Sequence, residues 1–293
     1  MALRLSIILL VLIVSTMSCQ APDRTDSQSA IRLITHNVYY GFTKIPDRKE
    51  QWLKWMQEQK PDIVSLQELN EYTPAQLEED ASSWGHSHTV LLKEEGFPTG
   101  ITSRFPIEDV HRYLDGFHHG LIRVKIRGIY IYVIHLHPSN WKFRHQEIDQ
   151  ILDNINDLPE NSRKILAGDF NTFSPVDSIF YQHGRLEPFF NGLDVRDNGN
   201  NLNEGKIDYG VIEKIIDSGL IDIEFKFRPS EYNFSGSFPA WLDTEGEHGD
   251  LRRLDYIFVS PNLVKKVKAA TIIADSTTQY LSDHLPVLMD FDL

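Results

Sequence analysis

The segment 129–134, which reads IYIYVI, constrains the fold more than any other part of the chain. Nearly all of its residues are apolar or aromatic, as expected of a β-strand that is covered on both faces. The run Leu121–Ile126 precedes it, and Arg127-Gly128 between the two runs predicts a hairpin turn. A hairpin covered on both sides belongs to a sheet inside a layered protein.

Other periodic segments extend this layered picture. Apolar stripes with helical spacing occur at 47–59, 144–157 and 208–218. Strands mixed with helices, with adjacent strands joined by a hairpin, predict an α/β fold in which sheet packs on sheet and helices lie outside. The remaining strand-like runs are 31–37, 62–67, 163–167, 254–259 and 285–291.

The bulk composition fits one large α/β domain. The 293 residues are 41% hydrophobic, which is ample for a packed core, and no internal repeat or second linker divides 31–293. The formal net charge of -13 argues against a protein that holds polyanions by surface charge alone. It does not exclude an enzyme that meets phosphate through a bound cation, because the cation reverses the local field.

The N-terminal segment 1–19 has the pattern of a signal peptide. Arg4 precedes an apolar run that is too short to span a bilayer comfortably. The junction before Cys19 resembles a bacterial lipoprotein signal, although Thr16 stands where leucine is usual. We therefore expect Cys19 to become an acylated N-terminus, with ordinary secretion as the alternative. The polar segment 20–30 predicts a flexible tether, and both routes place the protein outside the cytoplasm.

Polar residues follow several of the predicted strands. Asp169 and Asn171 lie two positions apart after an apolar run, and an extended chain would place both side chains on one side. They can orient a water molecule and hold a phosphate oxygen, or they can simply form a turn with Gly168. Glu68 ends another strand and is a candidate cation ligand with Asn37 nearby, although an ion pair would also explain it.

Two imidazoles and two further acids complete the polar set. Asp283-His284 precedes a strand and can place an acid beside a metal and an imidazole beside a phosphate. His135 ends the buried strand described above, and His137 competes with it for the same role. Asp255 can hold an imidazole in the correct tautomer, or it can form a salt bridge with an adjacent arginine.

Taken in order, the segments THNV, LQEL, GDFNT, LDYIFV and SDHLPV resemble the endonuclease/exonuclease/phosphatase superfamily. That group includes deoxyribonuclease I, repair nucleases, neutral sphingomyelinases and inositol polyphosphate phosphatases. The resemblance covers residues 31–291 in the family's order. It implies a four-layer αββα sandwich, with two mixed sheets packed face to face, and a hydrolase that acts on phosphoester bonds.

The resemblance also implies a divalent metal. Asn37, Glu68 and Asp283 are similar to the family's metal-side residues, so Mg²⁺ is the expected ion, with Mn²⁺ as a possible substitute. The ion would neutralise developing charge while water attacks phosphorus. Repair nucleases usually carry an acid where this chain has Tyr39, which separates it from the abasic-site repair branch.

The remaining implied roles concern proton transfer and substrate positioning. Asp169 and Asn171 are similar to the pair that positions the attacking water and the phosphate, and His284 is similar to a terminal histidine that Asp255 orients. Either Asp169 or His284 takes the proton from water, and His135 or the metal assists the leaving oxygen. His135 resembles the histidine of the deoxyribonuclease I and sphingomyelinase branches, where repair nucleases usually have tyrosine.

Three functions remain open at this point. The first is a secreted or surface-anchored nuclease-like phosphodiesterase, the second a sphingomyelinase-like hydrolase of phospholipid headgroups or other phosphoesters, and the third a non-catalytic binding lipoprotein. A nucleic-acid enzyme would show a basic stripe with aromatics, but bases such as Lys142, Arg144 and Arg252 are scattered. Since every catalytic position is filled, we expect an enzyme, nuclease-like and monomeric, that is anchored to a membrane if Cys19 is acylated.

Overall fold

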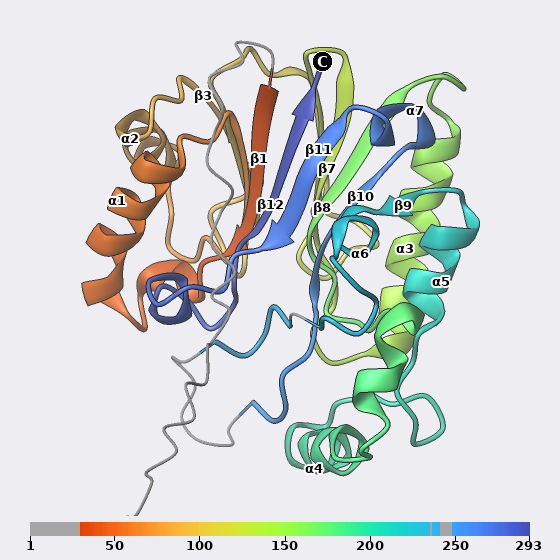
Figure 1. Ribbon diagram of the computed structural model, residues 1–293. Helices are drawn as coiled ribbons and strands as arrows, with labels where there is room; N and C mark the ends of the chain where they lie inside the picture. The colour runs from red at the N-terminus through yellow and green to blue at the C-terminus, as the bar shows by residue number, and fades with distance from the viewer. Residues whose placement is uncertain (1–29, 235, 241–247) are drawn as a thin grey trace, which may run out of the picture.

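The structure, a computed structural model, describes residues 30–234, 236–240 and 248–293. Two mixed β-sheets pack face to face with helices on their outer sides (Figure 1), which confirms the predicted four-layer α/β sandwich. The predicted signal peptide with Cys19, and the predicted tether except for Ala30, lie outside the described residues. Within the described ranges, no helix combines the length and apolar character needed to cross a membrane.

The first sheet brings the two ends of the described chain together. β1 and β2 are parallel neighbours, and β12 runs antiparallel to β1. The carboxyl ends of β1 and β2 therefore lie at the same edge as the start of β12. The strands are β1 (Ala30–Asn37), β2 (Ile63–Gln67), β3 (His88–Leu91), β4 (Gly100–Ser103), β11 (Val267–Ile272) and β12 (Val287–Asp292), in the order β11-β12-β1-β2-β4-β3.

The second sheet is built from the middle of the chain. β7 and β8 are parallel neighbours, and β10 runs antiparallel to β8, so the ends of β7 and β8 lie beside the start of β10. The strands are β5 (Glu108–Tyr113), β6 (Leu121–Ile126), β7 (Ile129–His135), β8 (Arg163–Asp169), β9 (Ile221–Asp222) and β10 (Asp255–Val259), in the order β5-β6-β7-β8-β10-β9.

The predicted hairpin joins β6 to β7. Arg127 and Gly128 have φ values of 51° and 76°, the left-handed conformation that a tight turn between twisted strands needs. Along β7, Ile131 lies in the core between the two sheets, whereas Tyr132 lies in the core under the outer helices. Burial on both faces explains why the segment 129–134 is so apolar.

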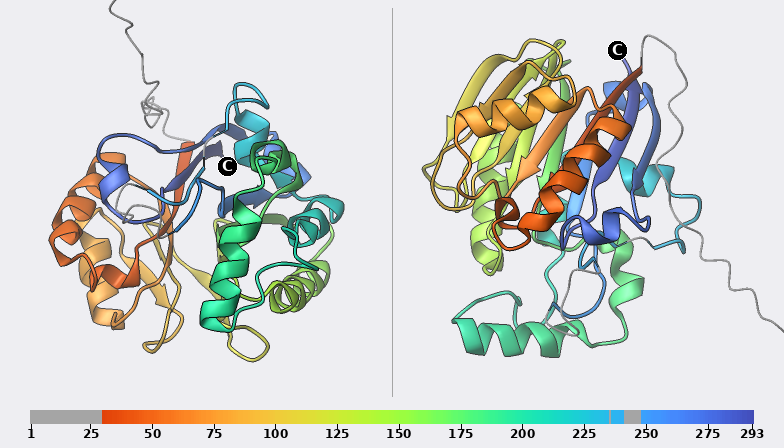
Figure 2. Two further views of the ribbon diagram at one scale, coloured as in Figure 1. Left: turned by 90° about the horizontal axis from the view of Figure 1, so that it is seen from below. Right: turned by 90° about the vertical axis from the view of Figure 1, so that its left-hand side faces the viewer.

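The helices cover the outer faces of the sheets. α1 and α2 pack on the first sheet, α3 and α5 pack on the second, and α4 lies beyond the ends of the strands (Figure 2). The three helices predicted from apolar stripes correspond to α1, α3 and α5. The helices are α1 (Lys49–Gln59), α2 (Pro74–Ser83), α3 (Trp141–Asn156), α4 (Leu186–Asp197), α5 (Gly210–Asp217), α6 (Ile223–Phe227) and α7 (Pro261–Val264), with short 3-10 helices at Tyr40–Phe42, Pro46–Arg48, Pro175–Tyr181 and Thr278–Tyr280.

Candidate active site

Strand register brings the predicted polar residues to one end of the sandwich. Asn37 pairs with Gln67 at the ends of β1 and β2, so Glu68 follows directly beside Asn37. His135 pairs with Asp169 at the ends of β7 and β8, and Asp255 pairs with Asp169 from the start of β10. The segment before β12, which carries Asp283 and His284, enters the same end of the first sheet.

Asn37 connects the two sheets. Its Nδ2 atom donates hydrogen bonds of 3.1 Å to Oε1 of Glu68 and 3.1 Å to Oδ2 of Asp169. Its Oδ1 atom accepts a bond of 3.1 Å from the backbone N–H of Tyr39 and keeps a second lone pair. The amide therefore fixes the positions of two carboxylates that come from opposite sheets.

A left-handed turn directly follows Asn37. Tyr39, Tyr40, Gly41 and Phe42 all have φ values between 47° and 65°. Three of these residues carry a Cβ atom, and each such residue costs about 1–2 kcal/mol in this conformation. In return the backbone N–H of Tyr40 donates a 2.9 Å hydrogen bond to Oε2 of Glu68. The turn thus aims backbone donors at the site, which no pattern in the sequence had indicated.

His284 is held between two carboxylates. Its Nδ1 atom lies 2.8 Å from Oδ2 of Asp255, and its Nε2 atom lies 3.8 Å from Oδ2 of Asp169. Arg253, one of the two adjacent arginines that were alternative partners of Asp255, instead forms an ion pair of 2.7 Å with Asp177 and further pairs with nearby acids. Asp255 is therefore free to orient the imidazole, as the resemblance implied.

The two site histidines have opposite charge states. Burial by itself would lower the pKa of His284, but the carboxylates of Asp255 and Asp169 raise it to about 10. Burial lowers the pKa of His135 to about 3, and the charge of His284 adds to this effect. Nε2 of His135 lies 3.7 Å from Oδ2 of Asp169. At neutral pH a cationic and a neutral imidazole therefore flank one carboxylate, as in acid–base pairs whose environments separate their pKa values.

Asp169 and Asn171 are not arranged as the sequence suggested. Asn171 has a φ of 48°, so the chain turns after Asp169 instead of continuing as an extended strand with both side chains on one side. The backbone N–H of Asn171 donates 2.9 Å to Oδ1 of Asp169, and its Nδ2 donates 3.1 Å to the carbonyl of Leu136. The expectation of an extended chain was wrong because the carboxylate of Asp169 accepts a hydrogen bond from the backbone amide two residues further on, which requires a turn.

His137, the competitor of His135, belongs to the rim of the site. Its Nδ1 atom accepts a 3.1 Å hydrogen bond from the backbone of Ser139, and its ring packs 3.9 Å from that of His118. His135 is the one that faces Asp169. The two histidines are two positions apart in the chain, and of the two only His135 is buried.

Glu68 and Asp283 offer carboxylate oxygens for a cation. Burial, opposed by the charge of His284 and assisted by that of Glu68, raises the pKa of Asp283 to about 7. A buried carboxylate whose pKa is raised by burial and by a neighbouring carboxylate fits a hard divalent ion, which prefers one or two carboxylates and offsets their charge. The donor set predicted for Mg²⁺ therefore suits such an ion.

A second group of possible ligands lies beside it. Ligand atoms of Asp169, Asp255 and His284 lie within 4.8 Å of one another, so this buried acid–histidine group can also bind a metal. We favour the Glu68 side, because the 2.8 Å contact with Asp255 already occupies Nδ1 of His284. A cation next to a charged imidazole would also be repelled.

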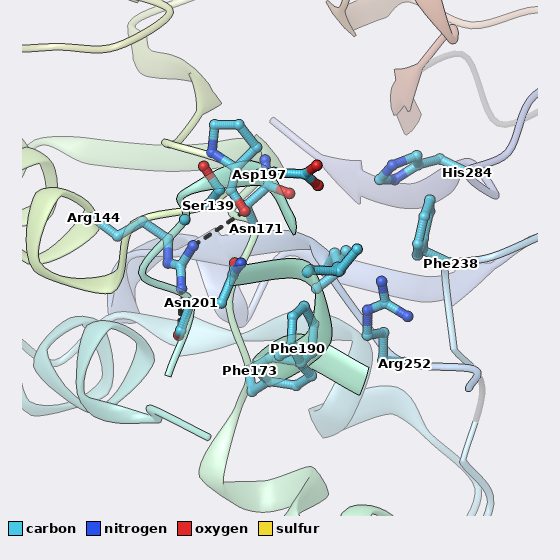
Figure 3. Close-up of a pocket in the computed structure, with 14 residues that line it drawn as sticks. Ser139, Arg144, Asn171, Phe173, Phe190, Asp197, Asn201, Phe238, Arg252 and His284 are labelled. Atoms are coloured by element: carbon cyan, nitrogen blue, oxygen red, sulfur yellow. Dashed lines mark hydrogen bonds between the residues drawn. The ribbon is translucent and has the colours of Figure 1, made fainter. Parts of the chain in front are cut away.

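A pocket of about 160 Å³ opens next to these residues (Figure 3). Asn171 and His284 lie on its wall, and Phe238 packs 4.6 Å from the ring of His284. α4 closes the far side with Phe190 and Leu193. The pocket can hold a part of the substrate that flanks the phosphate, and sequence reasoning did not locate it because α4 is remote from the motifs.

This fold and this group of side chains are those of a superfamily of hydrolases that act on phosphoester bonds. The chain belongs to the Endonuclease/Exonuclease/phosphatase family, whose sequence profile matches residues 34–284. No curated protein sequence matches the chain.

Solved structures share the fold at low sequence identity. An AP endonuclease from Archaeoglobus fulgidus has a TM-score of 0.66 and 22% identity, over 90% of this chain and 100% of that one. The Neisseria 3′ phosphatase NExo, bound to a product DNA hairpin, has a TM-score of 0.62 and 21% identity over 90% and 100%. An endonuclease/exonuclease/phosphatase from Beutenbergia cavernae has a TM-score of 0.61 and 19% identity over 90% and 72%.

Proposed function

We propose that this protein is an extracytoplasmic, Mg²⁺-dependent phosphodiesterase of the nuclease type. The observation that carries the proposal is the placement of cationic His284 and neutral His135 at 3.8 Å and 3.7 Å from one oxygen of Asp169. Such a pair offers a charged donor, a neutral imidazole and a carboxylate base around one point. This arrangement suits in-line attack of water on phosphorus.

The charge states assign the roles. Burial raises the pKa of Asp169 to about 7, so near neutral pH its carboxylate accepts a proton from water efficiently. His284 carries its proton already and therefore acts as a donor to phosphate oxygens instead of as the base. As water bonds to phosphorus, the bond from phosphorus to the leaving oxygen breaks, and His135 hydrogen-bonds to that oxygen. Asn171 positions the phosphate from the pocket side.

Asn37, Glu68 and Asp283 would hold Mg²⁺, or Mn²⁺ in its place, and the ion supplies charge neutralisation on the phosphate. The chain's own contribution at this point is the fixed geometry: the backbone amide of Tyr40 and the amide of Asn37 hold the Glu68 carboxylate in place.

The substrate proposed is nucleic acid. Support comes from the solved relative that was captured with a DNA hairpin. The proposed location rests on the sequence, in which residues 1–19 form a signal peptide, Cys19 is acylated and 20–30 is a tether. The proposed catalytic domain spans 31–293 and is a monomer. Incorporation of labelled palmitate, lost in Cys19→Ala, tests the anchor.

An activity panel tests the function. Plasmid DNA, RNA, sphingomyelin, inositol phosphates and bis-p-nitrophenyl phosphate are each offered with Mg²⁺ and with EDTA. We expect Mg²⁺-dependent cleavage of polynucleotide and of the small diester. If the protein cleaves sphingomyelin and none of the other compounds, the proposed substrate is wrong but the proposed active site stands. Inactivity on every compound, with Mg²⁺ binding retained, would favour the non-catalytic lipoprotein.

A further inference from the structure

A continuous row of aromatic rings crosses the rim of the site. Four separate segments contribute to it: the left-handed turn after β1, the loop between β3 and β4, the residues before β6, and the stretch from the end of β7 into α3. We call it the aromatic row, and its members are Tyr40, Phe97, His119, His118, His137 and Phe143.

Each ring of the row contacts the next. Tyr40 and Phe97 lie 5.1 Å apart between centroids, and Phe97 lies 5.4 Å from His119. His119 lies 4.4 Å from His118, and His118 lies 3.9 Å from His137. The row ends at Phe143, 5.2 Å from His137. These separations are within the range of direct ring contact.

The aromatic row is joined to the catalytic residues at two points. The backbone of Tyr40 holds Glu68 at one end of the row. In the middle, the ring of His135 stacks on that of His119 at 4.0 Å, with 14° between the planes. The row is thereby connected to Asp169 through His119 and His135, whose Nε2 atom lies 3.7 Å from the carboxylate.

Most of the row is accessible. Tyr40, Phe97, His137 and Phe143 are half-buried, and His118 is exposed. His119 is the buried member, and burial, with smaller effects from neighbouring charges, lowers its pKa below the ordinary value. The imidazoles of the row are thus neutral π surfaces at physiological pH.

Two buried imidazole nitrogens at this row lack a hydrogen-bond partner among the described residues. They are Nε2 of His119 and Nδ1 of His135, in side chains that are 5% and 3% exposed. A buried nitrogen without a partner is unfavourable unless a ligand supplies one. Both nitrogens lie beneath the accessible surface of the row, so the row itself presents ring surfaces to a ligand.

Lysines flank the row although the chain as a whole is acidic. Nζ of Lys44 lies 5.5 Å from the ring centroid of Tyr40. Nζ of Lys142 lies 5.5 Å from the ring of Trp141, two residues before Phe143. Lys93 is close enough for its charge to lower the pKa of His118, after the larger effect of burial. The fold thus brings three lysines that are scattered in the sequence close to the aromatic rings.

We propose that the aromatic row is a binding track for single-stranded nucleic acid, on which successive bases stack beside the scissile phosphate. The inference rests on the proposed function and names its substrate class. Aromatic platforms flanked by cations bind single strands without sequence preference, since every base has a π face. Bases paired inside a duplex have no free face to offer to such a row.

A phospholipid headgroup fits the row less well. The quaternary ammonium of a choline headgroup is attracted by aromatic rings, but the three lysines repel it. One headgroup also occupies one or two rings, whereas five of the six rings of this row are accessible. A polyanion with repeated flat groups uses the rings and the lysines together.

Binding is measured in EDTA, where turnover is absent. A fluorescein-labelled oligothymidylate of roughly 12 nucleotides reports the dissociation constant by anisotropy, with a DNA hairpin as the duplex competitor. We expect the single strand to bind more tightly than the hairpin. Phe97→Leu and His118→Ala should each weaken it by roughly five- to hundredfold, the effect of losing one stacking ring. Tyr232→Leu removes a 67% exposed ring outside the row and should leave the dissociation constant unchanged.

Stacking has a signature that needs no mutation. An oligonucleotide that contains 2-aminopurine should lose fluorescence when its bases stack on the parent protein. Binding without this quenching, equal binding of row and control variants, or row-dependent binding of sphingomyelin vesicles would each overturn the track. If the protein binds the oligonucleotide and quenches its fluorescence but is inactive, only the proposed phosphodiesterase activity is refuted. An active phosphodiesterase that binds the hairpin as well as the single strand refutes the track only.

Discussion

Nδ1 of His284 lies 2.8 Å from Oδ2 of Asp255, and this contact decides which nitrogen of the imidazole faces the phosphate site. Because the Nδ1–H group donates a hydrogen bond to Asp255, the Nε2 atom is left to point toward Asp169, at 3.8 Å. Both residues are buried, so water competes little for either partner. The charge of Asp255 thereby keeps the imidazole cationic at neutral pH.

Replacing Asp255 by Asn should remove the negative charge that stabilises the cationic form of His284. The pKa of His284, which burial lowers and the two carboxylates raise to about 10, falls in Asp255→Asn. Since the cationic form donates to phosphate, the alkaline limb of the pH–rate profile moves to lower pH, and the rate at neutral pH falls roughly a hundredfold or more. Initial rates on bis-p-nitrophenyl phosphate across pH measure both effects. An unchanged profile would show that Asp255 does not set the charge.

His284→Ala should lower kcat by roughly two to four powers of ten, the usual contribution of general acid–base help. Mg²⁺ binding, followed by calorimetry, should persist because Glu68 and Asp283 are intact. His111→Ala, which changes a partly exposed imidazole on β5, is the matched control and should keep the parent rate. Near-normal turnover in His284→Ala would remove this histidine from the mechanism.

Removal of the metal should abolish activity and lower stability together. With Mg²⁺ at a hundred times its dissociation constant, the folded state gains about 2.7 kcal/mol, which EDTA removes. Glu68→Gln should lose both the activity and the rise in Tm on adding Mg²⁺. Glu58→Gln, at an exposed position on α1, should lose neither. A Tm of Glu68→Gln that still responds to Mg²⁺ would place the ion elsewhere, for instance at Asp169, Asp255 and His284.

Two buried histidines outside the catalytic set should make the protein acid-sensitive. His36 accepts a 3.0 Å hydrogen bond from the indole of Trp52, and His86 contacts the hydroxyl of Thr102 at 2.8 Å. Burial lowers their pKa values from 6.5 to about 3 and about 4. Below pH 6.5 the unfolded chain binds protons at these histidines, whereas the folded chain does not. The free energy of unfolding therefore falls as the pH decreases below 6.5, and above pH 6.5 these two groups do not change it.

The slope of this acid sensitivity is measurable by urea unfolding. Each histidine contributes up to about 1.4 kcal/mol per pH unit between its folded and unfolded pKa. His86→Gln should therefore reduce the slope between roughly pH 5 and pH 6 by this amount. A slope identical to that of the parent would mean that His86 is protonated in the folded state.

Gly168→Ala should destabilise the fold. Gly168 has a φ of 149°, and a Cβ there would collide with the backbone carbonyl of Ile134 across the β7–β8 pair. We expect a loss of roughly 2–4 kcal/mol in the free energy of unfolding. Gly192→Ala is the control, because its Cβ on α4 would meet open space and should stabilise the helix by up to about 1 kcal/mol. Equal effects of the two changes would contradict the crowding at Gly168.

The sequence predicted the longer covered strands well, but its apolar runs marked neither the short strand β4, which is buried throughout, nor the exposed strand β5. β7 was recognised because both of its faces are buried, which leaves a run without polar residues. β5, which reads EDVHRY, is mostly exposed along its length and carries no apolar alternation that would mark a strand. α4 was missed for a related reason, since few of its residues are buried and its apolar stripe is weak.

Motifs in the sequence indicated which residues meet at the candidate site, but they did not indicate the arrangement around them. Asp169 and His284 are 115 positions apart, and only the strand register brings them to 3.8 Å. The left-handed turn at Tyr39 and Tyr40 contains one glycine, so its conformation has no clear sequence signal. The aromatic row draws single residues from four segments, and no local pattern records such a set.

Asn37 on one sheet holds Asp169 on the other, and this places the chemistry on the seam of the sandwich. If the sheets separate by even a small slide, the amide loses one carboxylate before either sheet has unfolded. Loss of turnover should then precede loss of secondary structure during gradual denaturation. Activity would therefore measure whether the two sheets are still packed against each other.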